Sequence, residues 1–414
     1  MHPDVGQILR LGWDGVRVAI LNITAGGMSS GYRKYLVDTI PILSSLPGVD
    51  ALLCASPASL RIQEWLGGLP NVSYVDCCPY NIINHFLLGG KDKRLEKHLD
   101  KFSPDVIFIP VDRYISYQDV PVVNMVRNME PLIGRLRGDS FRVRLKKWIQ
   151  YIDVKRAVKK SDGVIAISNF VRDFLINRWN IPHKKITLVY HGNNVPVQTR
   201  EEDAPPNIPV DWKGKFIFTL GSIRPARGLE DILGALKHLA RGPAVKGLVI
   251  AGDTSTDMVR YRRKLERWAN NQDLSSRVCW TGNLSENQVA WCYKNCLVFV
   301  MTSRVESFGL VALEAMSNGC ISIAANNPCL PEIFGDTAVF YPPADCKSLS
   351  EKLREVLRWS DQEKQEVSTK ARLRASRFSW ETNAIRTMEA LTRTVEASKR
   401  SNVRKCHEVK EVKA

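Results

Sequence analysis

Two glutamates, Glu306 and Glu314, stand in a stretch whose pattern places both of them near a predicted ligand site. The apolar run Val298–Thr302 predicts a buried strand, and residues 308–317 have the spacing of a helix that stops at Asn318-Gly319. Glu306 is then expected in the loop at the carboxyl end of the strand, and Glu314 about a turn and a half into the helix. Ligands of open α/β sheets bind at such strand ends, where a helix N-terminus also attracts phosphate. The two acids could therefore hold two hydroxyl-bearing parts of a phosphate ligand, although solvated side chains are the commoner case for an isolated pair of glutamates.

A second apolar run, Cys320–Ala325, follows the helix directly and completes a strand–helix–strand unit of the parallel, doubly wound type. Short runs rich in apolar and β-branched residues recur along the chain and are predicted to be further strands. They are Arg17–Asn22, Ala51–Cys54, Val72–Val75, Val106–Ile109, Val122–Val126, Gly163–Ser168, Ile186–Tyr190, Phe216–Leu220, Gly247–Gly252 and Val278–Gly282. Strands that alternate with helices over 414 residues predict an α/β protein of two domains.

The sequence around the two glutamates has a characteristic order. Glu306-Ser-Phe-Gly-Leu-Val-Ala-Leu-Glu314-Ala-Met is followed by Asn318-Gly319, Leu330-Pro-Glu-Ile and Tyr341-Pro-Pro-Ala-Asp345. This order resembles the C-terminal domain of retaining GT-B glycosyltransferases of family 4, the glycosyl transferases group 1. The resemblance covers about residues 17–395, weakly in the first half and strongly in the second. The resemblance implies the GT-B architecture, in which two Rossmann-like doubly wound domains face a central cleft.

The resemblance also implies roles for individual residues. In the family, the first glutamate of this motif contacts hydroxyls of the donor sugar and the second binds the ribose of the nucleotide, which implies a catalytic position for Glu306 and a donor-binding one for Glu314. Other residues expected to contact the donor begin the same helix or follow the strand that flanks the nucleotide base. They are Ser307, Phe308, Gly309 and Leu310 in the first group, and Gly282 and Leu284 in the second.

A glycine-rich turn after the first predicted strand contains Gly26 and Gly27. Backbone can approach a phosphate or a sugar closely at such a turn. The turn is not a P-loop, because Tyr32-Arg33 stands where Lys-Ser/Thr is required. In the resembling family it lies beside the donor phosphate and faces the acceptor, and an ordinary tight turn between strand and helix is the alternative.

A second turn of this kind, Gly221–Gly228, carries Arg224 and Arg227. The family has an arginine and a lysine here that clamp the diphosphate. Arg227-Gly228 matches the Lys-Gly step of the family, while Ser222 stands at the usual arginine position. Because guanidinium groups bind phosphate with two parallel hydrogen bonds, arginine is chemically suited to this clamp.

The predicted N-terminal domain departs from the family at the end of the strand Val122–Val126. Many members have a His-Asp pair there, with the histidine close to the reacting sugar, whereas this chain has Arg127 and Asn128. We expect these two residues to occupy catalytic positions, with another surface arginine as the alternative for Arg127. The residue that replaces the usual histidine therefore stays open.

The sequence predicts no metal and no cofactor besides the nucleotide-sugar substrate, such as a UDP- or GDP-sugar. No Asp-x-Asp motif occurs to bridge a metal and the diphosphate, so Arg224, Arg227 and the helix dipole would neutralise the leaving group. The cysteines show no zinc-ligand spacing. Retention could proceed through a covalent intermediate, or through the front-face displacement favoured for the family, in which the leaving phosphate assists deprotonation.

Composition limits the compartment and the partners. No stretch is long and apolar enough to span a membrane, and the N-terminus lacks the regions of a signal peptide, so a cytoplasmic protein is expected. The net charge of +16 suits anionic substrates, an anionic membrane or nucleic acid. Nucleic acid ranks last, because no zinc-finger, RRM or basic-zipper pattern accompanies the charge.

The expected domain boundaries follow from these patterns. An N-terminal acceptor domain is predicted over residues 1–195, a Pro- and acid-rich linker over 196–213, and the donor domain over 214–378. A helix over 379–397 is expected to cross back to the first domain, as in GT-B enzymes. The charged end, residues 398–414, lacks a core pattern and is predicted to be disordered.

The segment Arg135–Lys160 is basic and interleaved with apolar residues. Such a segment is typical of a peripheral membrane surface, which would bring in a lipid-linked acceptor, and a solvated helix packed on its own domain is the alternative. The whole sequence predicts a retaining glycosyltransferase with a nucleotide-sugar donor and a glycan or lipid-linked acceptor, of the kind used in polysaccharide biosynthesis. A GT-B epimerase or phosphorylase and a non-catalytic nucleotide-binding module are the alternatives.

Overall fold

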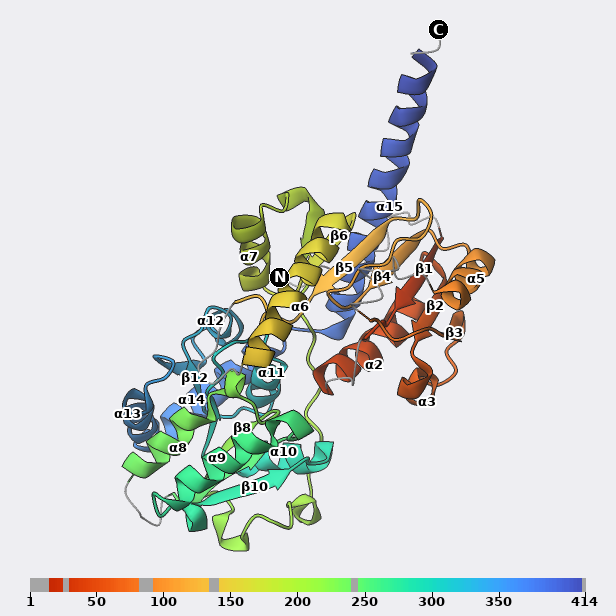
Figure 1. Cartoon of the computed structure of the whole chain (residues 1–414). Helices are drawn as coiled ribbons and strands as arrows, with labels where there is room; N and C mark the ends of the chain where they lie inside the picture. Colours follow the sequence, from red (N-terminus) through yellow and green to blue (C-terminus); the bar gives the residue numbers. More distant parts are fainter. Residues whose placement is uncertain (1–14, 25–29, 82–91, 134–140, 240–244, 412–414) are drawn as a thin grey trace. The chain divides into compact units, whose positions relative to one another are not determined.

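The computed structural model describes residues 15–24, 30–81, 92–133, 141–239 and 245–411 (Figure 1). The chain divides into two compact units. Unit 1 comprises Met1–Pro131, Lys146–Gly192 and Ser379–Ala414, and unit 2 comprises Leu132–Leu145 and Asn193–Phe378. In the described part of the chain, none of the helices combines the length and the apolar character that crossing a bilayer requires.

Unit 1 is built on a seven-stranded parallel sheet of order β3-β2-β1-β4-β5-β6-β7. Its strands are β1 Val16–Leu21, β2 Val49–Ser56, β3 Val72–Asp76, β4 Val106–Ile109, β5 Val122–Val126, β6 Gly163–Ala166 and β7 Ile186–Leu188. Its helices are α2 Ser30–Ser45, α3 Ile62–Leu66, α5 Lys93–Phe102, α6 Phe141–Lys160, α7 Asn169–Trp179 and α15 Trp380–Glu411, with the unit boundary falling inside α6. On one face of the sheet, Leu95 and Leu99 of α5 pack in a buried cluster with Ala19 and Leu21 of β1.

Unit 2 has a six-stranded parallel sheet of order β10-β9-β8-β11-β12-β13. Its strands are β8 Phe216–Leu220, β9 Gly247–Ala251, β10 Val278–Gly282, β11 Val298–Met301, β12 Ser322–Ala325 and β13 Ala338–Tyr341. Its helices are α8 Leu229–His238, α9 Val259–Asn270, α10 Glu286–Asn295, α11 Leu310–Ser317, α12 Leu330–Phe334, α13 Cys346–Leu357 and α14 Asp361–Ala375. Alternate residues of β8 face opposite layers: Ile217 joins the core with α8 and α13, while Phe216 stacks on Trp291 of α10.

Both sheets have the doubly wound strand order expected of Rossmann-like domains, so the predicted α/β fold class is confirmed. The four predicted strands Val106–Ile109, Val122–Val126, Phe216–Leu220 and Val278–Gly282 match the observed strands at both ends. The chain passes between units at Gly192–Asn193 and at Phe378–Ser379, and the backbone N–H of Asn193 donates to the Phe378 carbonyl at 3.1 Å.

Two predicted boundary segments differ from the observed structure. Residues 196–213, expected to be a linker, belong to unit 2, because Trp212 is buried against the backbone of Gly247. Residues 398–411, expected to be disordered, continue helix α15, which packs on α2 and on three strands of unit 1 nearer its start. Residues of high helix propensity and an Arg400–Glu396 ion pair at 3.1 Å stabilise this end of the helix. A helix can therefore continue here without an apolar face that packs in a core.

Candidate functional site

The predicted donor-binding turns meet where the winding of the second sheet reverses. Strands β8 and β11 are neighbours in the sheet but not in the chain, with Phe218 opposite Phe299. Loops that leave the carboxyl ends of two such strands diverge to opposite faces, which opens a place for a ligand. The turn after β8 carries Gly221 and Arg227, and the loop after β11 carries Glu306.

Arg227 and Glu306 form an ion pair at this point. Arg227 Nη1 lies 2.9 Å from Glu306 Oε2 and 3.1 Å from the hydroxyl oxygen of Ser303, and both charged side chains are 18% exposed. Gly221 makes room for the guanidinium. Its φ is +140°, and a Cβ at this residue would lie 2.8 Å from Arg227 Nε. The glycine is therefore required both by the backbone conformation and by the close approach of Arg227.

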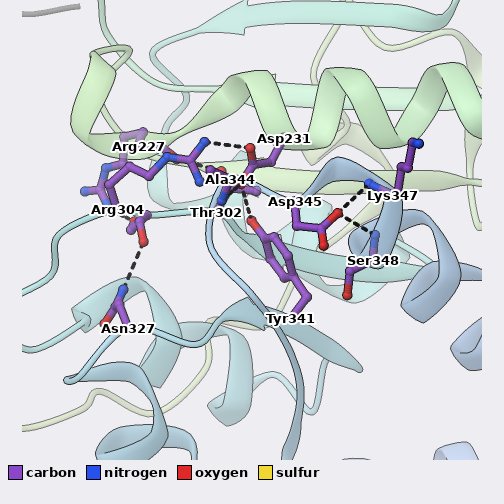
Figure 2. Close-up of polar contacts among 11 residues, drawn as sticks. Arg227, Asp231, Thr302, Arg304, Asn327, Tyr341, Ala344, Asp345, Lys347 and Ser348 are labelled. Carbon is purple, nitrogen blue, oxygen red and sulfur yellow. Dashed lines mark hydrogen bonds and ion pairs between the residues drawn. The ribbon is translucent and has the colours of Figure 1, made fainter. Parts of the chain in front are cut away.

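The loop between β11 and Glu306 is held by three backbone contacts. The Thr302 hydroxyl donates to the Arg227 carbonyl at 2.6 Å, and the Arg304 N–H donates to the Ala226 carbonyl at 2.8 Å. The side-chain amide of the buried Asn327 donates to the Ser303 carbonyl at 2.9 Å (Figure 2). The first two contacts tie the loop to the turn after β8 and the third ties it to the loop after β12, so the Arg227–Glu306 pair rests on a fixed backbone.

A buried carboxylate, Asp231 in the first turn of α8, reinforces the same loop. In Figure 2 the guanidinium of Arg304 points at the carboxylate of Asp231. Its two terminal nitrogens, Nη1 and Nη2, both donate to that carboxylate, with Nη2 at 2.6 Å. The Tyr341 hydroxyl donates to Asp231 at 2.9 Å and the Ala344 N–H at 3.0 Å. Burial alone would lower the pKa of the Arg304 guanidinium, but the hydrogen bonds and the charge of Asp231 outweigh it and raise that pKa.

Glu314 lies in helix α11, nearer its start than predicted. The helix begins at Leu310 rather than Phe308, because Gly309, with φ +101°, makes the left-handed entry to it. The Tyr293 hydroxyl of α10 lies 3.4 Å from Glu314 Oε2, within hydrogen-bond range. Ser307 and Phe308 are buried, and the Phe308 ring packs edge-on against Phe378 with centroids 6.0 Å apart, so a packing role accounts for this phenylalanine.

The other predicted donor-binding residues are placed as follows. Arg224 begins the short turn Pro225–Arg227, and its carbonyl accepts a hydrogen bond from the Arg227 N–H at 2.9 Å. Gly282 has φ +71° at the end of β10, and half-buried Leu284 lies just before helix α10. Because β9 separates β10 from β8 in the sheet, these two residues lie further along the same edge than Arg227. Gly26 and Gly27 lie outside the described residues.

Arg127 and Asn128, the predicted catalytic residues of unit 1, have different surroundings. The Arg127 guanidinium lies 4.1 Å from the centre of the Tyr32 ring and 5.7 Å from that of Tyr35. Burial lowers the pKa of this guanidinium, against the opposing effect of the tyrosines. Asn128 is exposed, and its side-chain oxygen accepts a hydrogen bond from the Glu130 N–H at 3.1 Å, as in a local turn.

Two residues that hold the site were missed from the sequence. Asp231 lies in the first turn of a helix, where an acid is ordinary because it complements the helix dipole. Arg304 lies 73 positions away along the chain, and no short-range pattern signals a pair at that separation. Within the described ranges, His, Cys, Asp and Glu side chains form no group of three or more that could hold a metal ion. The metal-free mechanism stays a prediction.

Two sequence families match the chain. The family described as "Glycosyl transferases group 1" matches residues 200–374, which contain Arg227, Glu306 and Glu314. The family described as "Glycosyltransferase Family 4" matches residues 46–195, which contain Arg127 and Asn128.

Relatives and solved structures agree with these matches. The "Serotype-specific mannosyltransferase WbdA" of Escherichia coli is 25% identical over 343 residues, which are 77% of this chain and 40% of that protein. Sucrose-phosphate synthase from Thermosynechococcus elongatus superposes with a TM-score of 0.71 at 17% identity, over 92% of this chain and 100% of the other. Anabaena HepE "in complex with UDP and glucose" superposes with a TM-score of 0.68 at 16% identity, over 91% and 99%. At such identities the solved structures show a common fold, and the chain spans less than half the length of WbdA.

Proposed function

We propose, since this chain belongs to the glycosyl transferases of group 1, that it is a retaining glycosyltransferase that uses a nucleotide-diphosphate sugar as donor. The acceptor is a glycan or a lipid-linked glycan. The observation that carries the proposal is the Arg227–Glu306 pair at the reversal point of the second sheet, because it sets a phosphate-binding cation beside a hydroxyl-binding carboxylate. The mannosyltransferase named among the relatives and the UDP bound to HepE support a sugar donor of the UDP or GDP type.

In this proposal the donor lies along the carboxyl edge of the second sheet. Glu306 contacts hydroxyls of the donor sugar, and Glu314 accepts hydrogen bonds from the ribose. The base lies near Gly282 and Leu284. These roles are the ones that the resemblance to the family implies. The order of the loops along the sheet is compatible with them, since β8 and β11 are adjacent and β10 is two strands away from β8.

To catalyse the transfer, the site must stabilise the departing diphosphate. As the bond from the sugar to the phosphate oxygen breaks, negative charge grows on that oxygen, and Arg227 with Arg224 neutralises it without a metal. In a front-face displacement, the acceptor hydroxyl attacks from the same side and gives its proton to the leaving phosphate, which preserves the anomeric configuration. Arg127 and Asn128 are the candidate catalytic residues of unit 1.

The test is a turnover assay with UDP-, GDP- and ADP-sugars, with and without a glycan or lipid-linked acceptor and with EDTA. A glycosyltransferase releases nucleoside diphosphate only when the acceptor is present, and the metal-free proposal requires that rate to survive the chelator. Conversion of the nucleotide sugar without any acceptor would favour an epimerase. Binding without turnover would favour a non-catalytic module.

A second part of the proposal concerns reversible contact with an anionic membrane at the cytoplasmic face. Helix α6 carries four exposed apolar residues at spacings of four, three and four, so they line one face of the helix. These residues are Phe141, Leu145, Trp148 and Ile152, and they are 78%, 47%, 61% and 36% exposed. The exposed basic residues Arg142, Arg144 and Lys146 flank them. An apolar stripe beside positive charge suits insertion among anionic headgroups.

The inner half of the same helix is anchored to unit 1. The carboxylate of Asp153 is buried and accepts hydrogen bonds from Arg113 at 3.0 Å and from the Tyr80 hydroxyl at 2.8 Å. Val154, Ala157 and Val158 are buried as well. The helix thus has one end packed in its unit and the other presenting apolar and basic side chains.

Co-sedimentation with liposomes tests the membrane contact. Binding should rise with the content of anionic lipid and fall with salt. Replacing Arg142, Arg144 and Lys146 by Glu should abolish it and leave nucleotide binding intact. The matched control reverses three exposed basic residues of α9, Arg260, Arg263 and Lys264, which should leave liposome binding in place. A wild-type protein that ignores anionic liposomes at low salt would refute the membrane contact.

A further inference from the structure

We propose that Glu306 occupies the phosphate-binding nitrogen of Arg227 when no donor is present, and that the donor diphosphate takes over this nitrogen and releases Glu306 to the donor sugar. The inference rests on the proposed function, because it assumes that Arg227 binds the diphosphate. It adds that the two residues exchange partners during donor binding. Glu306 would then act as an internal competitor of the diphosphate as well as a sugar ligand.

The hydrogen bonds of Arg227 carry the inference. A guanidinium Nη1 has two N–H donors, and here one points to Glu306 Oε2 at 2.9 Å and the other to the Ser303 hydroxyl oxygen at 3.1 Å. Both donors of this nitrogen are therefore engaged. The Nε atom is buried and has no hydrogen-bond partner among the described residues. The guanidinium thus has an occupied nitrogen and a nitrogen still lacking an acceptor.

The surroundings show where an acceptor for this guanidinium would lie. A small cavity with room for about one water molecule lies next to it at the carboxyl ends of β8 and β11, and Gly221, Arg227, Thr302 and Ser303 are part of its lining. Gly221 brings backbone rather than a side chain against the guanidinium, so no Cβ lies beside its Nε and Nη2 atoms. Phosphate binds guanidinium best through two parallel hydrogen bonds. Such a bidentate contact that uses Nη1 requires Glu306 to leave.

Charge explains why the exchange would go to completion with donor and only in part with the free nucleotide. The diphosphate is more negative than a single carboxylate, so it competes well for the guanidinium, but its charge repels the carboxylate that it displaces. A nucleotide sugar offers hydroxyl donors to the released carboxylate. A nucleoside diphosphate lacks this sugar, and its ribose hydroxyls are assigned to Glu314, so in its complex Glu306 stays a charged neighbour without compensation. Glu306 should therefore weaken the binding of the nucleoside diphosphate.

This leads to an experiment with an unusual sign. Glu306→Gln keeps the shape of the side chain and removes its charge, and its carbonyl accepts a weaker hydrogen bond from Arg227. Calorimetric titration should show the nucleoside diphosphate that binds the wild type, UDP or GDP, bound about five- to tenfold more tightly by this variant. Turnover of the nucleotide sugar should fall, because the sugar loses its carboxylate ligand. Glu306→Ala is a second variant and should shift the affinity in the same direction.

Glu351→Gln is the matched control, since it removes one negative charge from an exposed position of α13 in the same unit. It should leave the affinity for nucleoside diphosphate unchanged, and a tighter affinity here would assign the effect to net charge and overturn the exchange. Unchanged or weaker binding by both Glu306 variants would also overturn it while leaving the proposed function standing. A wild type that binds no nucleoside diphosphate at all would overturn the proposed function itself and the exchange with it.

Discussion

Asp231→Ala is the substitution whose cost follows most directly from the contacts of the second unit. Its carboxylate accepts four hydrogen bonds: two from Arg304, one from the Tyr341 hydroxyl at 2.9 Å and one from the Ala344 N–H at 3.0 Å. The Asp231 side chain is 4% exposed and that of Arg304 is 20% exposed. Truncation would therefore strand a largely buried cation together with two neutral donors.

The magnitude comes from the stranded charge rather than from the lost attraction. Removing one partner of a buried ion pair typically costs about 3–5 kcal/mol. Since one fifth of the Arg304 side chain reaches water, solvent can recover part of that cost. We expect a loss of about 3 kcal/mol in the free energy of unfolding of unit 2. Replacing Arg304 by Met in the same protein should recover part of the loss, because it removes the uncompensated cation.

Urea unfolding of the full chain, followed by near-ultraviolet circular dichroism and by tryptophan fluorescence, measures this loss. The two units need not unfold together, so the transition that shifts must be assigned by comparing the two probes. Donor turnover should fall in parallel, because Arg304 is two residues before Glu306 in a loop that Asp231 holds. A loss of less than about 1 kcal/mol would refute the reasoning, since exposed pairs contribute no more than that. Failure of Arg304→Met to restore any stability would refute the part that invokes a stranded charge.

Four further outcomes are expected. Glu306→Ala should lower turnover without weakening nucleotide affinity, whereas Glu314→Ala should mainly weaken nucleotide affinity, and steady-state kinetics with nucleotide titrations separate the two. Arg227→Ala should lower the turnover rate on the order of a hundredfold, by analogy with the loss of an oxyanion donor. If the wild type loses activity in EDTA and regains it with manganese, the proposal that arginines bind the diphosphate without a metal is contradicted. Gly221→Ala should impair nucleotide binding through both strain at φ +140° and the clash with the clamp guanidinium, visible as a raised dissociation constant. Burial and a neighbouring arginine charge hold the pKa of His191 well below its ordinary value. Stability should therefore fall as pH drops below about 6.5, because the unfolded chain binds the proton there before the folded protein does. His191→Phe should flatten this dependence of the melting temperature on pH.

The fold was largely predictable because its signals are local. Buried parallel strands read as short apolar runs, and β5, Val122–Val126, is buried at every position. The prediction of a linker was wrong because it, too, used only local composition. Proline and acid between Val195 and Lys213 are typical of an exposed connection, and the pattern could not reveal that Trp212 packs on the second unit.

The site was predictable in part. Arg227 and Glu306 were assigned from the resemblance to the family and from turns that follow predicted strands. Their mutual contact depends on which strands are neighbours, and strand order is not a local signal. Asp231 and Arg304 were missed because their pairing bridges distant segments. The stacking of Arg127 on Tyr32 was likewise out of reach, because it depends on how α2 packs beside the end of β5.

The central claim is that the second unit binds a nucleotide-sugar donor, with Arg227 and Glu314 holding its nucleotide part and Glu306 its sugar. A thermal-unfolding panel of UDP, GDP and ADP on the wild type and on Glu314→Ala tests it most directly. One nucleotide should stand out, because a ligand at 100 times its dissociation constant adds about 2.7 kcal/mol of stability. The same nucleotide should give a clearly smaller shift with Glu314→Ala. Equal and negligible shifts for all three nucleotides, or a shift that Glu314→Ala leaves unchanged, would contradict the claim.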